Sequence, residues 1–231
     1  MSNLLIIDTS AEVCTVALQS QRGRSIRQSP EPRTHGRFLL PAVQQVVEEQ
    51  ELQLGNLDAI AIVSGPGSFT GLRIGIGVVQ GLAAALEVPI TLLSSLEWLA
   101  CSAFSRYGSP VVTVCREARE QEFYLGTYRQ LVDDQVERVG EEAVVQGAQI
   151  ALPALLPAPD EWAAVGDGWN DWNRVPSSLS DHFTIVDPAL TADVESLCRL
   201  ANRKLLQKCF VAPEEALPSY LKTNLHYRTA L

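Results

Sequence analysis

A glycine-rich segment over residues 65–81 constrains the fold of this chain more than any other feature. It carries six of the fifteen glycines in the 231-residue sequence. Its first part predicts a tight loop after a strand, and the rest predicts a helix that reaches about Leu86, with Ser68 or Thr70 as N-cap. Each glycine inside a helix costs roughly 0.8 to 1 kcal/mol relative to alanine, so the helical glycines together cost about 3 to 4 kcal/mol. Some other interaction must offset that cost.

The spacing of the helical glycines predicts two bare strips on the helix. At about 100° per residue, Gly71 and Gly75 share one side, and Gly77 and Gly81 lie roughly 200° further round. One strip can accept the chain's own sheet, and the other could accept a helix from elsewhere. Both strips could also be filled within the domain, and spacing alone does not decide between these arrangements.

The same segment lacks the nucleotide-binding patterns that glycine-rich loops often carry. A Walker A loop ends in Gly-Lys-Ser/Thr, whereas every lysine of this chain lies beyond residue 200. The spacing Gly-x-Gly-x-x-Gly also fails, because the sixth position is Thr70 counted from Gly65 and Gln80 counted from Gly75. Neither a P-loop NTPase nor a dinucleotide enzyme is indicated.

Apolar runs on both sides of the segment predict an α/β fold. In the first half we expect two or three antiparallel strands, at 4–7, at 14–18 and after the turn at 21–24. Further strands are expected at 57–63 and 89–93, and helices at 38–47, 70–86 and 94–104. This order predicts a mixed sheet flanked by helices.

A composition break at residues 105–110 predicts two domains, an N-terminal domain over 1–105 and a smaller C-terminal domain over 106–231. The second half is predicted to hold strands at 111–115, 122–128 and 162–165 and a helix at 193–208.

Charge argues against tight, unaided binding of nucleic acid. The chain has 18 Lys and Arg against 27 Asp and Glu, a net charge of −9, whereas binding to phosphates needs concentrated positive charge. One basic stripe exists, formed by Arg199, Arg203, Lys204 and Lys208. The exposed face of a helix is its more common explanation.

Five cysteines without a Cys-x-x-Cys pair indicate buried thiols in a reducing compartment. The first residues lack the basic region and the long apolar run of a signal peptide. No uninterrupted apolar run approaches the ~20 residues of a membrane span. We therefore expect a cytoplasmic protein that makes no use of a membrane.

The turn Asp8-Thr9-Ser10 follows the first predicted strand and offers one carboxylate, two hydroxyls and backbone amides. This set suits a phosphate or Mg²⁺ site. The structural alternative, an Asx turn in which Asp8 accepts a hydrogen bond from nearby backbone, is the more common explanation. The three histidines are widely separated, so no metal site is expected from sequence-local ligands.

Five short stretches, in order across nearly the whole chain, resemble the TsaB (YeaZ) family. They are Leu5-Ile6-Ile7-Asp8-Thr9-Ser10, the block from Gly65 to Gly75, Glu117-Ala118-Arg119 leading to Glu122-Phe123-Tyr124, Gly166-Asp167-Gly168-Trp169 and Pro218-Ser219-Tyr220-Leu221. The glycine block is the most specific of them. The resemblance implies an actin/Hsp70-like (ASKHA) fold of two related α/β domains. It also implies a place in the bacterial machinery that makes N6-threonylcarbamoyladenosine (t6A) at position 37 of tRNA.

In that machinery the related protein TsaD transfers the threonylcarbamoyl group, TsaE is an ATPase, and TsaB is understood as the partner of TsaD. The resemblance implies that the helices at about 36–50 and 70–86 pair with TsaD or, in the isolated protein, with a second copy. The implied partner surface draws on Leu39, Leu40, Val43, Gly71, Ile74, Gly75, Ile76, Gly77, Val78 and Gly81. The sequence does not decide which of the apolar side chains point outward. ATP or ADP is implied only at an interface shared with a partner.

The resemblance implies that this chain lacks the catalytic chemistry of TsaD. The metal site of TsaD uses two histidines four residues apart, and the matching positions here are Ser94 and Trp98. Neither side chain ligates iron or zinc well. The chain also has Glu117 where relatives commonly have Asp, and Glu120-Gln121 where they have Met-Gly, which leaves the role of that hairpin open.

We interpret the chain as a non-catalytic scaffold with no metal and no cofactor of its own, which meets tRNA only indirectly. The alternative is an enzyme. It would be an ATP-binding ASKHA phosphotransferase that uses Asp8 with Mg²⁺, or a metallopeptidase-like protein.

Overall fold

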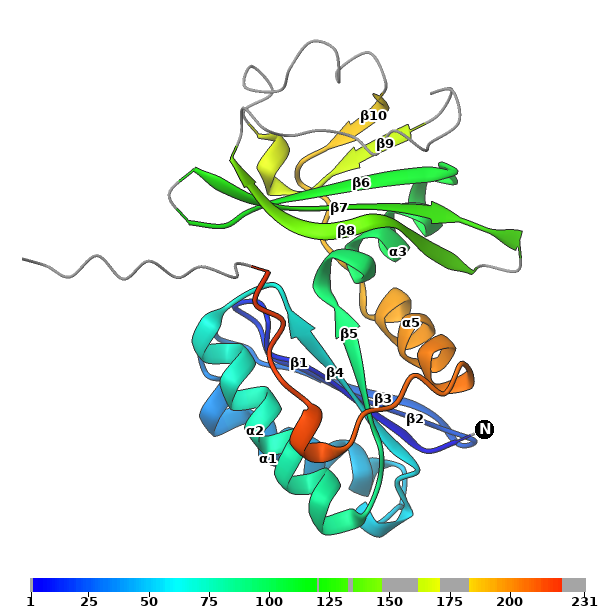
Figure 1. Cartoon of the computed structure of the whole chain (residues 1–231). Helices are drawn as coiled ribbons and strands as arrows, with labels where there is room; N and C mark the ends of the chain where they lie inside the picture. The colour runs from blue at the N-terminus through cyan, green and yellow to red at the C-terminus, as the bar shows by residue number, and fades with distance from the viewer. Residues whose placement is uncertain (1, 120, 133–134, 147–161, 171–182, 222–231) are drawn as a thin grey trace, which may run out of the picture. The chain divides into compact units, whose positions relative to one another are not determined.

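Two five-stranded mixed sheets organise the chain in the computed structural model (Figure 1). The structure describes residues 2–119, 121–132, 135–146, 162–170 and 183–221. The chain divides into two compact units, one formed by residues 1–102 with 192–219 (unit 1) and the other by residues 103–191 with 220–231 (unit 2).

The sheet of unit 1 has the strand order β3-β2-β1-β4-β5. Its strands are β1 (Leu4–Asp8), β2 (Thr15–Ser20), β3 (Gly23–Gln28), β4 (Ala59–Gly65) and β5 (Ile90–Ser94). The first three pair antiparallel, whereas β4 pairs parallel with both β1 and β5. Every residue of β1 and β4 is buried, because these inner strands are covered on both faces. The prediction of a first strand buried on both faces is confirmed.

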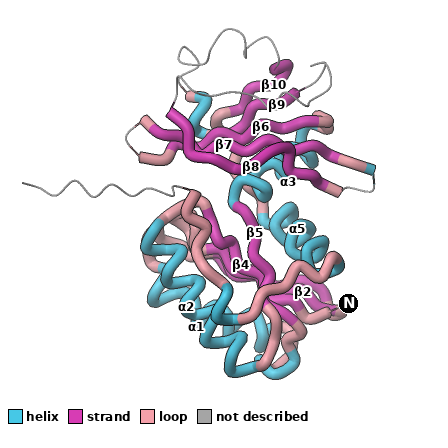
Figure 2. The backbone as a smooth tube through the Cα atoms, viewed as in Figure 1, coloured by secondary structure: helices cyan, strands magenta, loops and turns pink. Residues whose placement is uncertain are grey.

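Helices cover both faces of this sheet (Figure 2). On one face α1 (His35–Glu49) and α2 (Phe69–Leu86) lie side by side. They close a core that includes Leu5 and Ile7 of β1. The opposite face is covered by α5 (Val194–Leu206), which contacts β1 and β5. A 3-10 turn, η1 (Leu54–Asn56), precedes β4.

The C-terminal part of the chain belongs to unit 1, which differs from the expected boundary between 1–105 and 106–231. Residues 192–219 group with the N-terminal unit. The reason is that α5 is amphipathic and buries Leu197, Cys198, Leu200 and Ala201, an apolar face that needs a sheet to cover it. The segment then continues through the 3-10 turn η6 (Pro213–Glu215), which packs beside α2.

The sheet of unit 2 has the order β10-β9-β6-β7-β8. Its strands are β6 (Val111–Glu117), β7 (Glu122–Gln130), β8 (Val136–Gln146), β9 (Trp162–Val165) and β10 (Phe183–Asp187). The helix α3 (Ser95–Tyr107) precedes β6, and a 3-10 turn, η4 (Asp167–Trp169), follows β9. Trp169 is buried against Cys115 and Phe183 in the core of this unit.

The two sheets repeat one topology. In each, three strands that follow one another in the chain form an antiparallel meander, and two further strands add in parallel beside the first strand of the meander. This duplication is the pair of related α/β domains expected for the ASKHA fold.

Candidate functional site

The turn after β1 is an Asx turn. Asp8 Oδ1 accepts a hydrogen bond of 2.7 Å from the backbone N–H of Ser10, and Asp8, Thr9 and Ser10 are all buried. The carbonyl of Ser10 accepts a 2.7 Å hydrogen bond from the backbone N–H of Ser68, which ties the turn to the start of α2. In the ranges that the structure describes, no group of three or more His, Cys, Asp or Glu side chains is placed to hold a metal ion.

The first bare strip of α2 is filled by that turn. Ser68 is the N-cap, and its Oγ accepts a hydrogen bond from the backbone N–H of Gly71. A Cβ on Gly71 would overlap the backbone oxygen of Thr9, and a Cβ on Gly75 would overlap Thr9 Oγ1. The glycines therefore allow the helix to lie directly on the backbone of the β1–β2 turn.

The second bare strip is open. Apart from its chain neighbours and the nearby backbone of its own helix, a Cβ added to Gly77 or to Gly81 would meet no atom of the described residues within 4 Å. Both glycines are exposed. Beside them Ile74 and Val78 are half-buried, and on α1 the side chain of Leu40 is 52% exposed. We call these five residues the α1/α2 surface.

Other residues of the implied partner surface lie inside the fold and not on it. Leu39 and Val43 of α1 and Ile76 of α2 belong to the core, with exposed fractions of 1%, 2% and 3%, and Gly71 and Gly75 are buried. Their burial leaves them no surface that a partner could reach in this fold. The apolar residues of each helix span more than one face, and only the fold decides which face meets the sheet.

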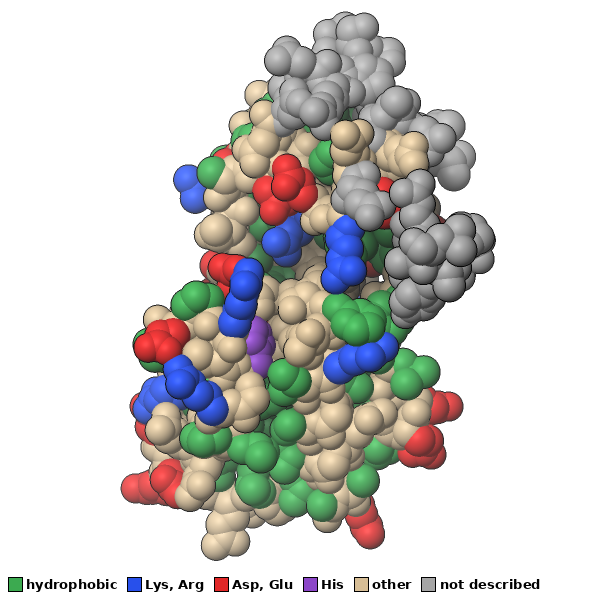
Figure 3. All heavy atoms as spheres, turned by 90° about the vertical axis from the view of Figure 1, so that its left-hand side faces the viewer, with side chains coloured by type: hydrophobic (Ala, Val, Ile, Leu, Met, Phe, Trp, Pro, Cys, Tyr) green, Lys and Arg blue, Asp and Glu red, His purple; other side chains and the backbone are tan. Residues whose placement is uncertain are grey.

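Figure 3 views the side of unit 1 that carries α1 and α2. Hydrophobic side chains lie in the middle of this face among uncharged polar side chains and backbone, and acidic side chains lie toward its edges. At the start of α2, Phe69 is 39% exposed, and the guanidinium of Arg73 lies 3.8 Å from the centre of its ring. The face is therefore apolar at its centre, with charge at its margin.

The helix α2 is unusually apolar for one at a protein surface. Its mean hydropathy is 1.5 over 18 residues, of which 33% are buried. By length and composition alone it is the single helix among the described residues that could cross a membrane. Its first turns are instead fixed on the β1–β2 turn through Gly71 and Gly75, so the apolar residues left outside belong to a surface helix.

Ser94 and Trp98, which the resemblance sets against the TsaD histidines, both make hydrogen bonds within the fold. Ser94 Oγ caps α3 by accepting hydrogen bonds from the backbone N–H groups of Leu96 and Glu97, at 3.1 and 3.3 Å. The indole N–H of Trp98 donates to the carbonyl of Asp193 at 2.7 Å, which joins α3 to the start of α5.

Most of the basic stripe on α5 is paired with acids of unit 1. Arg203 and Lys204 approach the carboxylate of Glu97 at 3.4 and 3.0 Å, and their side chains are only 16% and 25% exposed. Arg199 pairs with Glu195 at 3.6 Å. These pairs leave little free positive charge for a phosphate backbone.

The charged segment after β6 forms the turn of a hairpin. The backbone N–H of Ala118 donates to the carbonyl of Glu122, and that of Glu122 donates to Arg119. The N–H of Glu117 donates to Asp167 Oδ1 at 2.8 Å. The departure at Glu120 lies outside the described residues.

All five cysteines are free thiols, and Cys209 alone among them is exposed. Burial raises the pKa of the Cys14 and Cys115 thiols to about 12 and that of Cys198 to about 11. These groups stay protonated near neutral pH and are poor nucleophiles.

Comparisons with known proteins agree with this structure. A family model described as TsaD, tRNA N6-adenosine threonylcarbamoyltransferase, matches residues 29–225. The tRNA threonylcarbamoyladenosine biosynthesis protein TsaB of Escherichia coli K12 is 32% identical over 97% of this chain and 96% of its own length. The TsaB protein of Haemophilus influenzae is 30% identical over 97% of this chain and 95% of its own length.

Two solved structures from Pseudomonas aeruginosa match nearly the whole fold. One is described as YeaZ and the other as an uncharacterized protein with similarity to peptidase YEAZ. Both are 38% identical, with TM-scores of 0.85 and 0.86, over 96% of this chain and 100% of theirs. With the duplicated mixed sheets and the glycine-bearing α2 already described, these similarities establish that the chain belongs to the TsaB (YeaZ) family of tRNA threonylcarbamoyladenosine biosynthesis proteins.

Proposed function

We propose that this chain is a non-catalytic partner subunit that binds TsaD through the α1/α2 surface and so supports threonylcarbamoyl transfer to adenosine 37 of tRNA. TsaE would join the larger complex. The chain would contact tRNA only through its partners, and ATP or ADP would bind only where this chain and a partner share an interface. The proposal places the protein in the cytoplasm.

The observation that carries the proposal is the open strip at Gly77 and Gly81. Each of these glycines costs the helix roughly 0.8 to 1 kcal/mol relative to alanine, yet no described atom of the chain occupies the space that they leave. A helix of a partner could lie there almost backbone to backbone. The cost to the free subunit would then be offset in the complex.

The apolar residues beside the strip would supply the driving force. Leu40 is half exposed and Ile74 and Val78 are half-buried, so each has apolar area that a partner can remove from water. Such burial contributes about 25 cal/mol per Å². The charge at the margin of the face would orient the partner and affect its association rate.

The non-catalytic role rests on the chemistry of the residues that TsaD would use. Ser94 and Trp98 are occupied by hydrogen bonds that build α3 and fix α5. Asp8 makes the backbone contact of an Asx turn. With a net charge of −9, a role in tRNA modification is best served by a protein partner that binds the tRNA.

Reconstitution of tRNA modification tests the proposal. We expect t6A to form with TsaD, TsaE and this chain, to fall sharply when this chain is omitted, and not to form with this chain alone. The double variant Gly77→Leu/Gly81→Leu should behave like the omission. Gly55→Leu is the matched control, because Gly55 also has open space around it and an ordinary backbone conformation.

Either of two results would refute a part of the proposal. Full activity without this chain would remove its role as a required subunit. Threonylcarbamoyl transfer by this chain alone would show that it is an enzyme.

In the absence of TsaD the same surface would pair with a second copy. Sedimentation of the isolated protein should then give a dimer for the wild type and for Gly55→Leu, and a monomer for the double variant. A dimer that survives the double change would place self-association elsewhere on the chain.

A further inference from the structure

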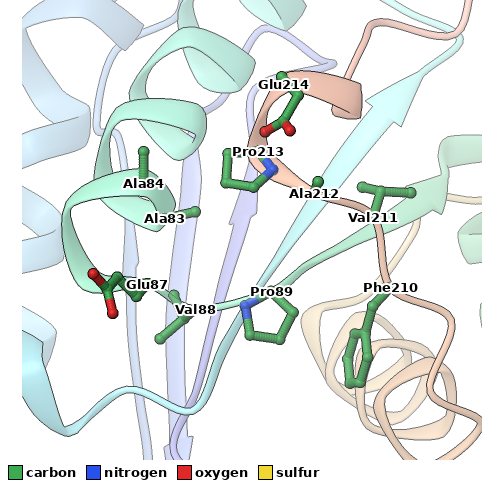
Figure 4. Close-up of a pocket in the computed structure, with 10 residues that line it drawn as sticks. All are labelled: Ala83, Ala84, Glu87, Val88, Pro89, Phe210, Val211, Ala212, Pro213 and Glu214. Atoms are coloured by element: carbon green, nitrogen blue, oxygen red, sulfur yellow. The ribbon is translucent and has the colours of Figure 1, made fainter.

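A hollow outside the α1/α2 surface lies where the C-terminal segment crosses the end of α2 and the start of β5 (Figure 4). It encloses about 660 Å³ and is open to solvent. One side is formed by residues 83–84 and 87–89 and the other by residues 210–214, all of unit 1. We call it the C-terminal hollow.

The walls of the C-terminal hollow are held by main-chain hydrogen bonds. Ile90 and Val211 exchange two of them, at 3.2 and 2.9 Å, and Thr91 Oγ1 donates to the carbonyl of Cys209 at 3.1 Å. Further along, the side-chain amide of Gln80 donates to the carbonyl of Ala216 at 3.0 Å. Because the walls are already in place, a ligand would not have to pay for ordering them.

The interior of the hollow is apolar and incompletely covered. Val88 and Pro89 on one side and Val211 and Pro213 on the other are half-buried. The ring of Phe210 is 39% exposed beside them. An apolar side chain placed here would cover surface that the chain leaves in contact with water.

The rim of the hollow is negative without a counter-ion. Glu87 extends from the α2 side and Glu214 from the C-terminal side (Figure 4), and both are exposed. Within the part of the chain that the structure describes, neither carboxylate has an ion-pair or hydrogen-bond partner.

Glu87 is moreover an unfavourable residue for its position. It is the C-cap of α2 in the left-handed conformation, with φ 56° and ψ 37°, where glycine is the usual choice. A helix C-terminus already carries partial negative charge, so a carboxylate there is repelled. A residue that opposes both local preferences is expected where a function offsets the cost.

We propose that the C-terminal hollow binds a segment of another protein that carries an apolar side chain next to a lysine or arginine. The apolar side chain would pack against Phe210 and the prolines, and the cation would lie against one of the two rim carboxylates, Glu87 or Glu214. The charge of the rim repels nucleic acid and acidic segments and therefore selects this class of partner. The proposal is independent of TsaD binding.

Titration of the isotopically labelled full chain with the dipeptide acetyl-Leu-Arg-amide tests this directly by NMR. We expect the amide resonances of Val88, Ala212 and Glu214 to shift on addition of the peptide. The shifts should saturate with a dissociation constant in the millimolar range. Acetyl-Leu-Glu-amide should bind more weakly than acetyl-Leu-Arg-amide, by up to about fivefold, because one exposed ion pair contributes up to about 1 kcal/mol. The double variant Glu87→Gln/Glu214→Gln should remove the preference for the arginine peptide.

The matched control is Glu31→Gln/Glu48→Gln, which makes the same change in net charge at exposed glutamates of unit 1 away from the hollow. It should bind the arginine peptide like the wild type. Equal binding of both peptides, or an unchanged preference in Glu87→Gln/Glu214→Gln, would overturn the proposal. So would binding that appears only after removal of residues 222–231, because the chain's own end would then be the occupant.

Discussion

Gly75 of α2 lies against the side chain of Thr9 so closely that even a methyl group on the glycine would overlap Thr9 Oγ1. This relationship places α2 directly on the β1–β2 turn and turns the opposite side of the helix, with Gly77 and Gly81, toward solvent. Glycine thus allows close packing on one side of α2 and leaves open surface on the opposite side.

The two kinds of glycine should respond to alanine in opposite ways. Gly75→Ala forces atoms apart in a packed region and should lower the free energy of unfolding by about 1 to 3 kcal/mol. Gly81→Ala adds a good helix former where space is open and should raise it by about 0.8 to 1 kcal/mol. Urea denaturation of both variants checks the pair, and destabilisation by Gly81→Ala would contradict the open strip.

Glu97 should contribute to the attachment of α5. Its side chain is 11% exposed and lies between Arg203 and Lys204. Glu97→Gln keeps the shape but leaves two cations without their counter-ion, so we expect a loss of about 2 kcal/mol in unfolding free energy. Glu195→Gln is the control, because that side chain is 55% exposed and its loss should cost about 0.5 kcal/mol. Equal losses of unfolding free energy in the two variants would show that the buried ion pairs of Glu97 stabilise the protein no more than the exposed pair of Glu195.

Asp193 should stabilise α5 in a pH-dependent manner. Burial alone would raise its pKa, but hydrogen bonds with Ser196 and Ser102 and the charge of Arg199 lower the pKa below its ordinary 3.8. Its contribution is therefore present above pH 3.8 and is lost as the pH falls through the lower pKa of the folded state.

Asp193→Ala should cost about 1 kcal/mol at neutral pH, because the N-cap hydrogen bond to Ser196 is lost. The difference from wild type should shrink in strongly acidic solution. Asp193→Asn, which keeps a capping oxygen, should lose less stability. Thermal unfolding across the acidic range checks both variants. A stability difference between wild type and Asp193→Ala that grows as the pH falls would contradict the prediction.

Cys209 should react with thiol reagents before the other cysteines. It is exposed, whereas the other four are buried, and burial raises the pKa of Cys14 and Cys115 to about 12. We expect one fast-reacting thiol in the folded protein, and all five after unfolding. Cys209→Ser should abolish the fast phase of the reaction. If the fast phase persisted, a buried cysteine would have to become accessible to the reagent through local unfolding.

The sequence was informative wherever local pattern and burial coincide. The uninterrupted apolar runs of β1 and β4 predicted inner strands, and the glycine spacing predicted two bare strips on α2. It was less informative where the answer depends on contacts distant in sequence. Leu39 and Leu40 are adjacent and chemically identical, yet only the packing of α1 on the sheet decides that the first is core and the second surface.

The second half was predicted less well for the same reason. The long strand β8 (Val136–Gln146) is an edge strand with many charged residues, so it shows no clean alternation. The sequence predicts helix α5 as part of the second domain, because the helix lies after the composition break at residues 105–110. Its return to the sheet of unit 1 is a long-range pairing that no local signal encodes.

The residue types alone suggest a turn at Asp8, whereas only the resemblance to the TsaB family singles out Ser94 and Trp98. In the structure each takes part in a backbone hydrogen bond. The bonds of Asp8 and Ser94 are local, each reaching a backbone N–H two residues further on. The partner of Trp98, the carbonyl of Asp193, lies 95 residues away and depends on the fold.

The most direct test of the central claim is calorimetric titration of TsaD with this protein and its glycine variants. We predict measurable binding by the wild type and by Gly55→Leu, and at least a hundredfold loss, about 2.7 kcal/mol, for Gly77→Leu/Gly81→Leu, whose melting temperature should be no lower than that of wild type. Affinity within about twofold of wild type for that folded double variant, a difference of roughly 0.4 kcal/mol, would contradict the assignment of the open strip of α2 as the surface that binds TsaD.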